Sequence, residues 1–179
     1  ILVKPTIMTI EHLKIPVLFN QLESALQETM AERQVVDPIV IGIHTGGVWV
    51  AEKMHQWLNI AEPLAVLDIS FYRDDFSQIG VNPKVQQSKL PLTVEGRDII
   101  LIDDVFYTGR TIRAALNEIF DYGRPNQVIL GVLIERDGRQ VPIRPDCVGA
   151  EVNLAAGQRI KLTGPEPLDI DIQTVTKEA

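Results

Sequence analysis

Residues 99–111 read IILIDDVFYTGRT, and the fold prediction starts from this stretch. Its first four residues form a continuous apolar run, which is typical of a parallel strand buried on both faces. Asp103 and Asp104 follow the run directly, and a Thr-Gly pair then leads into a helix predicted over residues 111–122. A strand, a polar turn and a helix in this order indicate an α/β domain.

Strands and helices continue to alternate on both sides of this stretch. The spacing of apolar residues predicts helices over residues 10–33, 48–58 and 111–122, and strands over residues 38–43, 64–70, 99–102, 128–134 and 141–148. We expect one α/β domain over residues 1–179, with a mainly parallel central sheet flanked by helices. Ligands of such sheets bind at the carboxyl ends of the strands, so the loops after the strands are the expected site.

The acidic pair and the Thr-Gly turn suit different parts of one ligand. Adjacent carboxylates after a buried strand are costly to bury unless they meet hydroxyls, a cation or a metal. Thr108, Gly109 and Thr111 precede or begin a helix, where backbone N–H groups and hydroxyls suit a phosphate. A sugar phosphate offers both features. The alternative is that the acids cap the helix and that the Thr-Gly pair is only a turn.

Composition excludes several other classes of protein. No apolar run approaches the roughly 20 residues that span a bilayer, so we expect no membrane segment. The single cysteine, Cys147, allows no internal disulfide and indicates a reducing, cytoplasmic compartment. The three histidines are scattered and give no zinc spacing. The net charge is −7 with dispersed Lys and Arg, which disfavours a mainly electrostatic nucleic-acid binder.

The stretch at residues 99–111 resembles the 13-residue PRPP-binding signature of type I phosphoribosyltransferases. The segments IGIHTGGVWVAEKM, LDISFYRDD and GRPNQVILGVLIERDGRQVPIRPDCVG narrow the resemblance to the PyrR family, and it covers residues 36–172. The resemblance implies the type I phosphoribosyltransferase fold, with a flexible lid hairpin at about residues 72–96 and a small hood at about residues 141–172. It also implies formation of UMP and pyrophosphate from uracil and PRPP with Mg²⁺, in a cytoplasmic homodimer or homotetramer.

The resemblance assigns roles to individual residues. Asp103 and Asp104 are implied to be the catalytic pair and to bind the ribose hydroxyls. Mg²⁺ is implied to bridge substrate oxygens near these two residues. The 5′-phosphate is implied to meet Thr108, Gly109 and Thr111, together with Tyr107 and Arg110. The pyrophosphate is implied to meet Thr45, Gly46 and Gly47, together with Arg73 and Arg136. A purely structural role is an equally good interpretation of Arg136. The base is implied to meet Val148 and Gly149, and candidate RNA contacts are Arg139 and Arg144.

The chain departs from the family pattern in two places. The pyrophosphate loop commonly reads Thr-Arg-Gly, whereas this chain has Gly46 at the second position and lacks that charge. The first predicted helix carries more acids than bases, although RNA-binding relatives carry basic residues there. Two alternatives to the uracil enzyme stay open. One is an RNA-binding attenuation regulator that senses pyrimidine nucleotides, and the other is a purine phosphoribosyltransferase.

Overall fold

The computed structural model describes residues 7–69, 90 and 93–174. Within these ranges the helices are η1 (Ile10–His12), α1 (Ile15–Glu32), α2 (Gly46–Leu58) and α3 (Arg110–Asp121). The strands are β1 (Ile39–Ile43), β2 (Ala65–Leu67), β3 (Asp98–Phe106), β4 (Gln127–Arg136), β5 (Cys147–Val152), β6 (Gln158–Thr163) and β7 (Asp169–Thr174).

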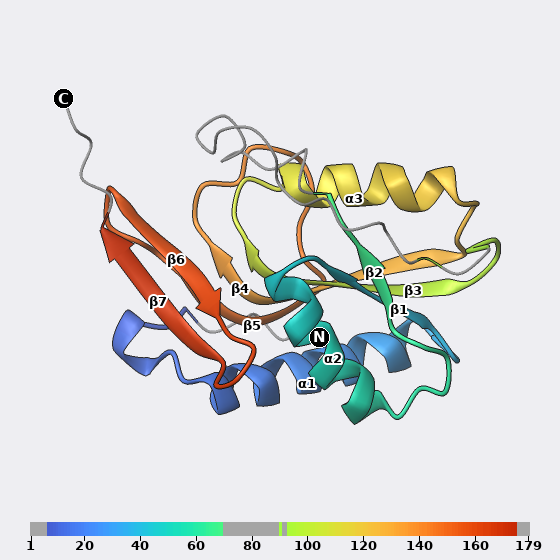
Figure 1. The fold of residues 1–179 in the computed structure, drawn as a ribbon, viewed down its shortest axis with the longest axis horizontal. Coiled ribbons are helices and arrows are strands. Elements are labelled where there is room, and N and C mark those ends of the chain that lie inside the picture. Colours follow the sequence, from blue (N-terminus) through green and yellow to red (C-terminus); the bar gives the residue numbers. More distant parts are fainter. Residues whose placement is uncertain (1–6, 70–89, 91–92, 175–179) are drawn as a thin grey trace.

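Five strands form one parallel sheet with the order β2-β1-β3-β4-β5 (Figure 1). Its central strand β3 pairs with β1 through Ile39 and Ile99, and with β4 through Ile99 and Val128. All carboxyl ends therefore lie at one edge of the sheet. The predicted fold class, a mainly parallel sheet flanked by helices, is confirmed.

Helices cover both faces of this sheet, with α1 and α2 on one face and α3 on the other (Figure 1). Side chains of β3 alternate between the two faces because successive residues of a strand point in opposite directions. Ile100 and Ile102 pack into the core beneath α1, whereas Ile99 and Leu101 pack into the core beneath α3. This double burial explains the continuous apolar run in the sequence.

A second, two-stranded antiparallel sheet is formed by β6 and β7 and lies beside the carboxyl edge of the main sheet (Figure 1). Ile160 and Leu162 turn one face of it into the core shared with α1. Trp49 of α2 packs against Gly164, which lies between β6 and β7. A Cβ on Gly164 would lie 3.1 Å from the Trp49 ring. This small sheet is called the hood below. Trp49 thus has a packing role.

Several predicted boundaries are wrong. Residues 141–146 form no strand, and β5 instead runs over Cys147–Val152. Pro142 and Pro145 lack the N–H that a strand ladder requires. The hood expected over residues 141–172 therefore divides, because β5 belongs to the main sheet and the hood sheet begins at Gln158. The proposed lid, residues 72–96, lies largely outside the described residues.

Three further boundaries affect the site or its surroundings. The strand predicted to end at residue 102 continues to Phe106, so both acids lie within β3 rather than in a turn after it. The helix predicted to start at residue 48 starts at Gly46, with Thr45 as its N-cap residue. The long first helix is interrupted, because η1 ends at His12 and α1 begins at Ile15 with a proline in its first turn.

Candidate functional site

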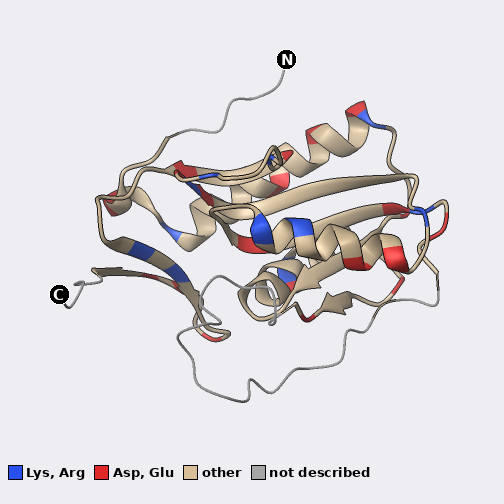
Figure 2. Ribbon diagram, turned by 90° about the horizontal axis from the view of Figure 1, so that it is seen from above, with Lys and Arg blue, Asp and Glu red and all other residues tan. Residues whose placement is uncertain are grey.

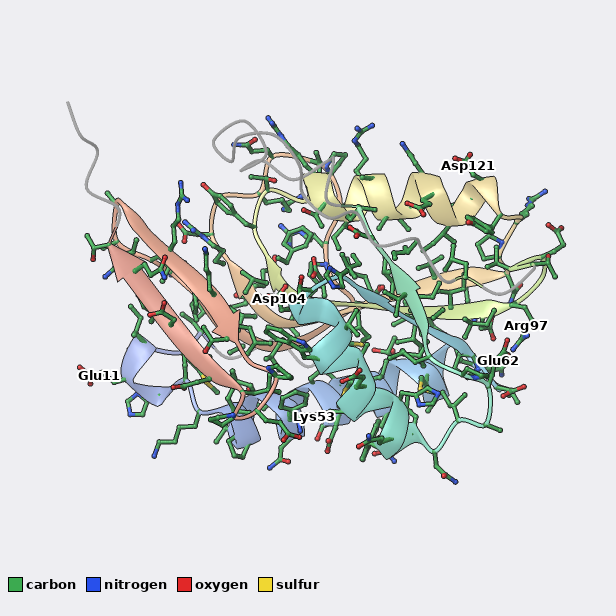
Figure 3. All side chains as sticks on the ribbon, in the orientation of Figure 1. Glu11, Lys53, Glu62, Arg97, Asp104 and Asp121 are labelled. Carbon is green, nitrogen blue, oxygen red and sulfur yellow. The ribbon has the colours of Figure 1, made fainter. Side chains whose placement is uncertain are left out.

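The two acids of the central stretch lie at the carboxyl edge of the sheet and differ in exposure. Asp103 is only 2% exposed, whereas Asp104 is partly exposed. The backbone N–H of Asp104 donates to Oδ1 of Asp103 at 3.0 Å, which fixes the buried carboxylate beside the strand. Figure 3 shows Asp104 at this edge, far from the ion pair of Arg97 and Glu62 at the opposite end of the sheet. Asp104 is therefore the more accessible of the two acids.

The first turn of α2 packs directly against these acids. A Cβ on Gly46 would lie 2.2 Å from Oδ2 of Asp104, and a Cβ on Gly47 would lie 3.0 Å from Oδ1 of Asp103. Both glycines are buried. Only residues without a side chain allow the helix start to approach the strand this closely. The predicted pyrophosphate loop and the predicted ribose-binding acids are thus brought together.

Thr45 and His44 complete the loop before α2. The hydroxyl of Thr45 and Nδ1 of His44 are 3.0 Å apart, and the backbone N–H of His44 donates to the carbonyl of Leu67 on β2 at 2.8 Å. The peptide bond between His44 and Thr45 is cis. Because α2 begins directly after Thr45, its first turn lies at the carboxyl edge, and the start of a helix favours an anion.

The predicted phosphate loop lies on the other side of β3, at the start of α3. Thr108 is 7% exposed, and its hydroxyl accepts a hydrogen bond from the backbone N–H of Arg110 at 3.3 Å. Gly109 is the N-cap residue of α3 with φ +86°, and a Cβ there would lie 2.4 Å from Cγ2 of Val141. Glycine is required here by both conformation and space. Thr111 sits in the first turn of α3.

Arg136, at the end of β4, is stacked on Tyr107. Its guanidinium carbon is 3.9 Å from the centroid of the tyrosine ring, and Nη1 donates to the carbonyl of Gln158 at 3.4 Å. Gly138 presses on the same ring, since a Cβ there would lie 2.3 Å from Cε2. Sequence reasoning missed this stacking. Strand β3 lies between Arg136 and the loop at Thr45, so the structure does not bring Arg136 together with that loop.

Val148 and Gly149, the predicted base contacts, lie in β5 of the main sheet rather than in the hood. Val148 pairs with Val132 and is 9% exposed. A Cβ on Gly149 would lie 2.8 Å from the carbonyl oxygen of Leu18, so this glycine lets α1 approach the sheet. Both residues have a packing role, and their role toward the base stays a prediction.

The candidate RNA contacts Arg139 and Arg144 lie in the exposed loop between β4 and β5. Arg139 donates through Nη1 to the carbonyl of Val141 at 3.1 Å. Both arginines act on Glu135, whose pKa is raised mainly by burial and further by Glu151, while Arg144 and Arg139 oppose the rise. Glu135 and Glu151 are paired across β4 and β5. The sequence did not predict this pair of glutamates. Arg73, a predicted pyrophosphate contact, lies outside the described residues.

No group of three or more His, Cys, Asp or Glu side chains in the described residues has a geometry that could hold a metal ion. None of the helices in this part of the chain has the length and apolar character needed to cross a membrane.

Comparison with known proteins identifies the same family as the sequence motifs. The phosphoribosyl transferase domain family matches residues 11–158. The chain is 54% identical to the Bifunctional protein PyrR of Nitrosococcus oceani over 165 residues, which cover 91% of this chain and 93% of that protein. It is 51% identical to the Bifunctional protein PyrR of Pseudomonas syringae over 159 residues, 89% of this chain and 94% of that protein.

Solved structures resemble this fold at lower sequence identity. A purine phosphoribosyltransferase from Pyrococcus horikoshii has a TM-score of 0.58 at 22% identity and covers 78% of this chain and 85% of that chain. A hypoxanthine phosphoribosyltransferase from Staphylococcus aureus has a TM-score of 0.57 at 15% identity and covers 77% and 74%. At these identities the likeness concerns the fold alone.

Proposed function

Because the chain belongs to the phosphoribosyl transferase domain family, and within it to the PyrR family, we propose that it transfers the phosphoribosyl group of PRPP to uracil. The products are UMP and pyrophosphate. The predicted family is confirmed by the comparisons, whereas the choice of uracil rests on the resemblance to PyrR proteins. One structural observation carries the proposal: two glycines of α2 allow the start of this helix to lie directly against the acidic pair of β3.

The acidic pair holds the ribose in this proposal. Asp104 accepts hydrogen bonds from ribose hydroxyls, and Asp103 is buried behind it and held by the Asp104 N–H. A carboxylate beside the sugar also favours the positive charge that develops on the ribose ring as the pyrophosphate leaves. The acids thus contribute both orientation and electrostatic stabilisation.

The 5′-phosphate binds at the start of α3. Thr108, Gly109, Arg110 and Thr111 supply hydroxyls and backbone N–H groups, and the helix dipole favours an anion there. Tyr107 belongs to the same loop, but its ring supports Arg136. Two helix starts, on opposite faces of the main sheet (Figure 1), therefore suit the two phosphate groups that flank the ribose of PRPP.

The pyrophosphate binds at Thr45, Gly46 and Gly47. Gly46 brings no positive charge, so backbone N–H groups of α2 and the Thr45 hydroxyl are the donors in this proposal. Arg73, in the segment expected to form the lid, is proposed to add positive charge. We expect weaker dependence on side-chain charge here than in relatives with arginine at this position.

The reaction requires little covalent chemistry from the protein. The bond between C1 of the ribose and pyrophosphate breaks with its electron pair leaving on oxygen. N1 of uracil forms the new bond to C1 and loses its proton. The residues named above orient the reactants and stabilise the cationic centre. A closed lid keeps water from the same centre.

Mg²⁺ fits this donor set as a substrate-bound ion. Magnesium prefers carboxylate, phosphate and water oxygens and often has few direct protein ligands. Asp103 and Asp104 are the residues that would hold it, together with PRPP oxygens, because they are adjacent carboxylates at the carboxyl edge of the sheet. When bound, it neutralises charge on the pyrophosphate. The homo-oligomer expected from the resemblance stays a prediction.

The test is PRPP-dependent conversion of radiolabelled uracil with Mg²⁺, run beside hypoxanthine and guanine. We expect UMP from uracil and no purine nucleotide. The Asp104→Asn variant, purified in the same way, shows whether the activity belongs to this protein rather than to a contaminant. Turnover of a purine without turnover of uracil would refute the proposed base.

A further inference from the structure

Arg136 is held between the signature loop and the hood by contacts that leave part of its guanidinium unused. The guanidinium carbon lies 3.9 Å from the ring centroid of Tyr107, and Nη1 donates to the carbonyl of Gln158. Both partners are uncharged. The ion pairs found within the described residues involve Arg33 and Arg97, and none of them involves Arg136.

The Nε–H of Arg136 is a buried donor with no hydrogen-bond partner in the part of the chain that the structure describes. Buried polar groups are normally hydrogen-bonded, and an exception in a native structure needs an explanation. A cation fixed in position, without a carboxylate and with a free donor, suits a ligand that brings an acceptor oxygen.

The position of Arg136 in the sheet indicates which part of the substrate supplies the acceptor oxygen. The order β1-β3-β4 places the loop at Thr45 on one side of the acids and Arg136 on the other. Strands lie about 4.8 Å apart, so β4 is roughly 10 Å from β1. In a displacement at C1 the entering base lies opposite to the leaving pyrophosphate. Arg136, which also contacts the hood, is therefore on the side of the base.

We propose that Arg136 is a base-binding residue whose Nε–H donates to a carbonyl oxygen of the pyrimidine, with Tyr107 as the positioning residue that holds the guanidinium. The inference rests on the proposed function and replaces the pyrophosphate role predicted for Arg136. It also gives a base contact outside Val148 and Gly149, which lie within the main sheet.

Three substitutions separate the donor from the charge. Arg136→Lys keeps the charge but places a methylene where Nε stood, and Arg136→Gln keeps an N–H at that position without the charge. Arg136→Met removes both. Dissociation constants for UMP and for PRPP with Mg²⁺ are measured by calorimetry, since UMP carries the base and PRPP carries the pyrophosphate on the same ribose 5-phosphate.

We expect Arg136→Met and Arg136→Lys to weaken UMP binding roughly ten- to a hundredfold, as for loss of a hydrogen bond from a charged group. Arg136→Gln should weaken it less than Arg136→Met. PRPP affinity should change less than about twofold, within the spread of independent sites. The matched control is Arg159→Met, which removes an exposed charge of the hood and should change neither affinity.

Tyr107 is tested by rescue. Tyr107→Leu removes the ring under the guanidinium and should weaken UMP binding, and Tyr107→Phe should restore most of that loss. Thermal unfolding of each variant identifies loss of folding. A larger loss of PRPP than of UMP affinity would return Arg136 to the pyrophosphate. Unchanged affinity for both ligands, or wild-type UMP binding in Arg136→Lys, would overturn the inference.

Failure of the proposed function would give a different experimental result from failure of the Arg136 inference. If the wild-type protein turned over a purine and not uracil, the base assignment would fail. The same comparison with the corresponding purine nucleotide would then still test whether Arg136 binds the base.

Discussion

Gly46 and Asp104 are in such close contact that no side chain fits between them. A Cβ on Gly46 would lie 2.2 Å from Oδ2 and 2.6 Å from Cγ of Asp104. The carboxylate of Asp104 therefore occupies the space that any side chain at position 46 would need.

The Gly46→Ala substitution should displace Asp104 without unfolding the protein, because the contacted oxygen is the end of a short side chain that can rotate. We expect kcat/KM to fall about ten- to a hundredfold, which is about 1.4–2.8 kcal/mol of lost transition-state stabilisation. Steady-state kinetics with PRPP and uracil measure it. In an Asp104→Ala background the same change should have little further effect. An equal loss in both backgrounds would mean that Gly46 acts independently of Asp104.

Asp104→Asn tests the charge of the exposed acid at constant size. Loss of a negative charge beside the developing cation should lower kcat by roughly a hundred- to a thousandfold, as for removal of one electrostatic stabiliser. The fold should be unaffected, because the carboxylate lies at the edge of the sheet. Single-turnover kinetics and circular dichroism check the two statements. Wild-type kcat would show that the catalytic centre lies elsewhere.

Gly109→Ala should lower the thermal stability and weaken PRPP binding. The residue has φ +86°, and the new Cβ would meet Cγ2 of Val141 at 2.4 Å. We expect a loss of roughly 1–3 kcal/mol in the free energy of unfolding from the strained backbone alone, with the contact adding to it. Gly96→Ala is the matched control, because Gly96 has φ +67° and nothing within 4 Å of its Cβ position. The difference between the two variants isolates the contact, and Val141→Ala should reduce it.

The parallel sheet was predictable because its strands are buried on both faces. A run such as IILI needs apolar residues at every position when one set packs beneath α1 and the other beneath α3. The close approach of Gly46 to Asp104 also had a sequence signal, since a Thr-Gly-Gly turn and an acidic pair both follow strands. Their meeting follows from β1 and β3 being neighbours.

Other features depend on tertiary contacts that the sequence does not carry locally. Aspartate disfavours strands, yet β3 continues through both acids because β4 offers a ladder partner as far as Phe106 and Glu135. Val141 and Ile143 alternate like strand residues, but the prolines beside them prevent pairing. The stacking of Arg136 on Tyr107 joins the last residue of β4 to the loop after β3, and no spacing rule predicts it.

Binding of a leader transcript of its own gene should be weak and salt-sensitive. Lys and Arg are spread over several elements with Asp and Glu between them (Figure 2). Arg33 is paired with Asp146, and Arg139 is bonded to the carbonyl of Val141. We expect a dissociation constant no tighter than about 10⁻⁶ M at physiological salt, the range of non-specific binding. Filter binding over a salt series measures it. Nanomolar affinity that is lost in an Arg139→Gln, Arg144→Gln double variant would instead identify a dedicated RNA surface.

Glu135 should make stability depend on pH. Its pKa is raised by burial and by the facing carboxylate of Glu151, so the folded protein binds a proton more readily than the unfolded chain. The ionised group therefore opposes folding above its raised pKa, and this penalty disappears as the pH falls below the ordinary carboxyl range. We expect Glu135→Gln to unfold at a higher temperature than the wild type at neutral pH, with the difference shrinking toward pH 4, near the ordinary glutamate pKa of about 4.3. Glu151→Gln should remove part of the same penalty, because it removes only the second cause. Thermal unfolding across this pH range is the measurement. A Glu135→Gln variant that is less stable at neutral pH would show that the attraction of Arg144 and Arg139 outweighs burial and the Glu151 carboxylate.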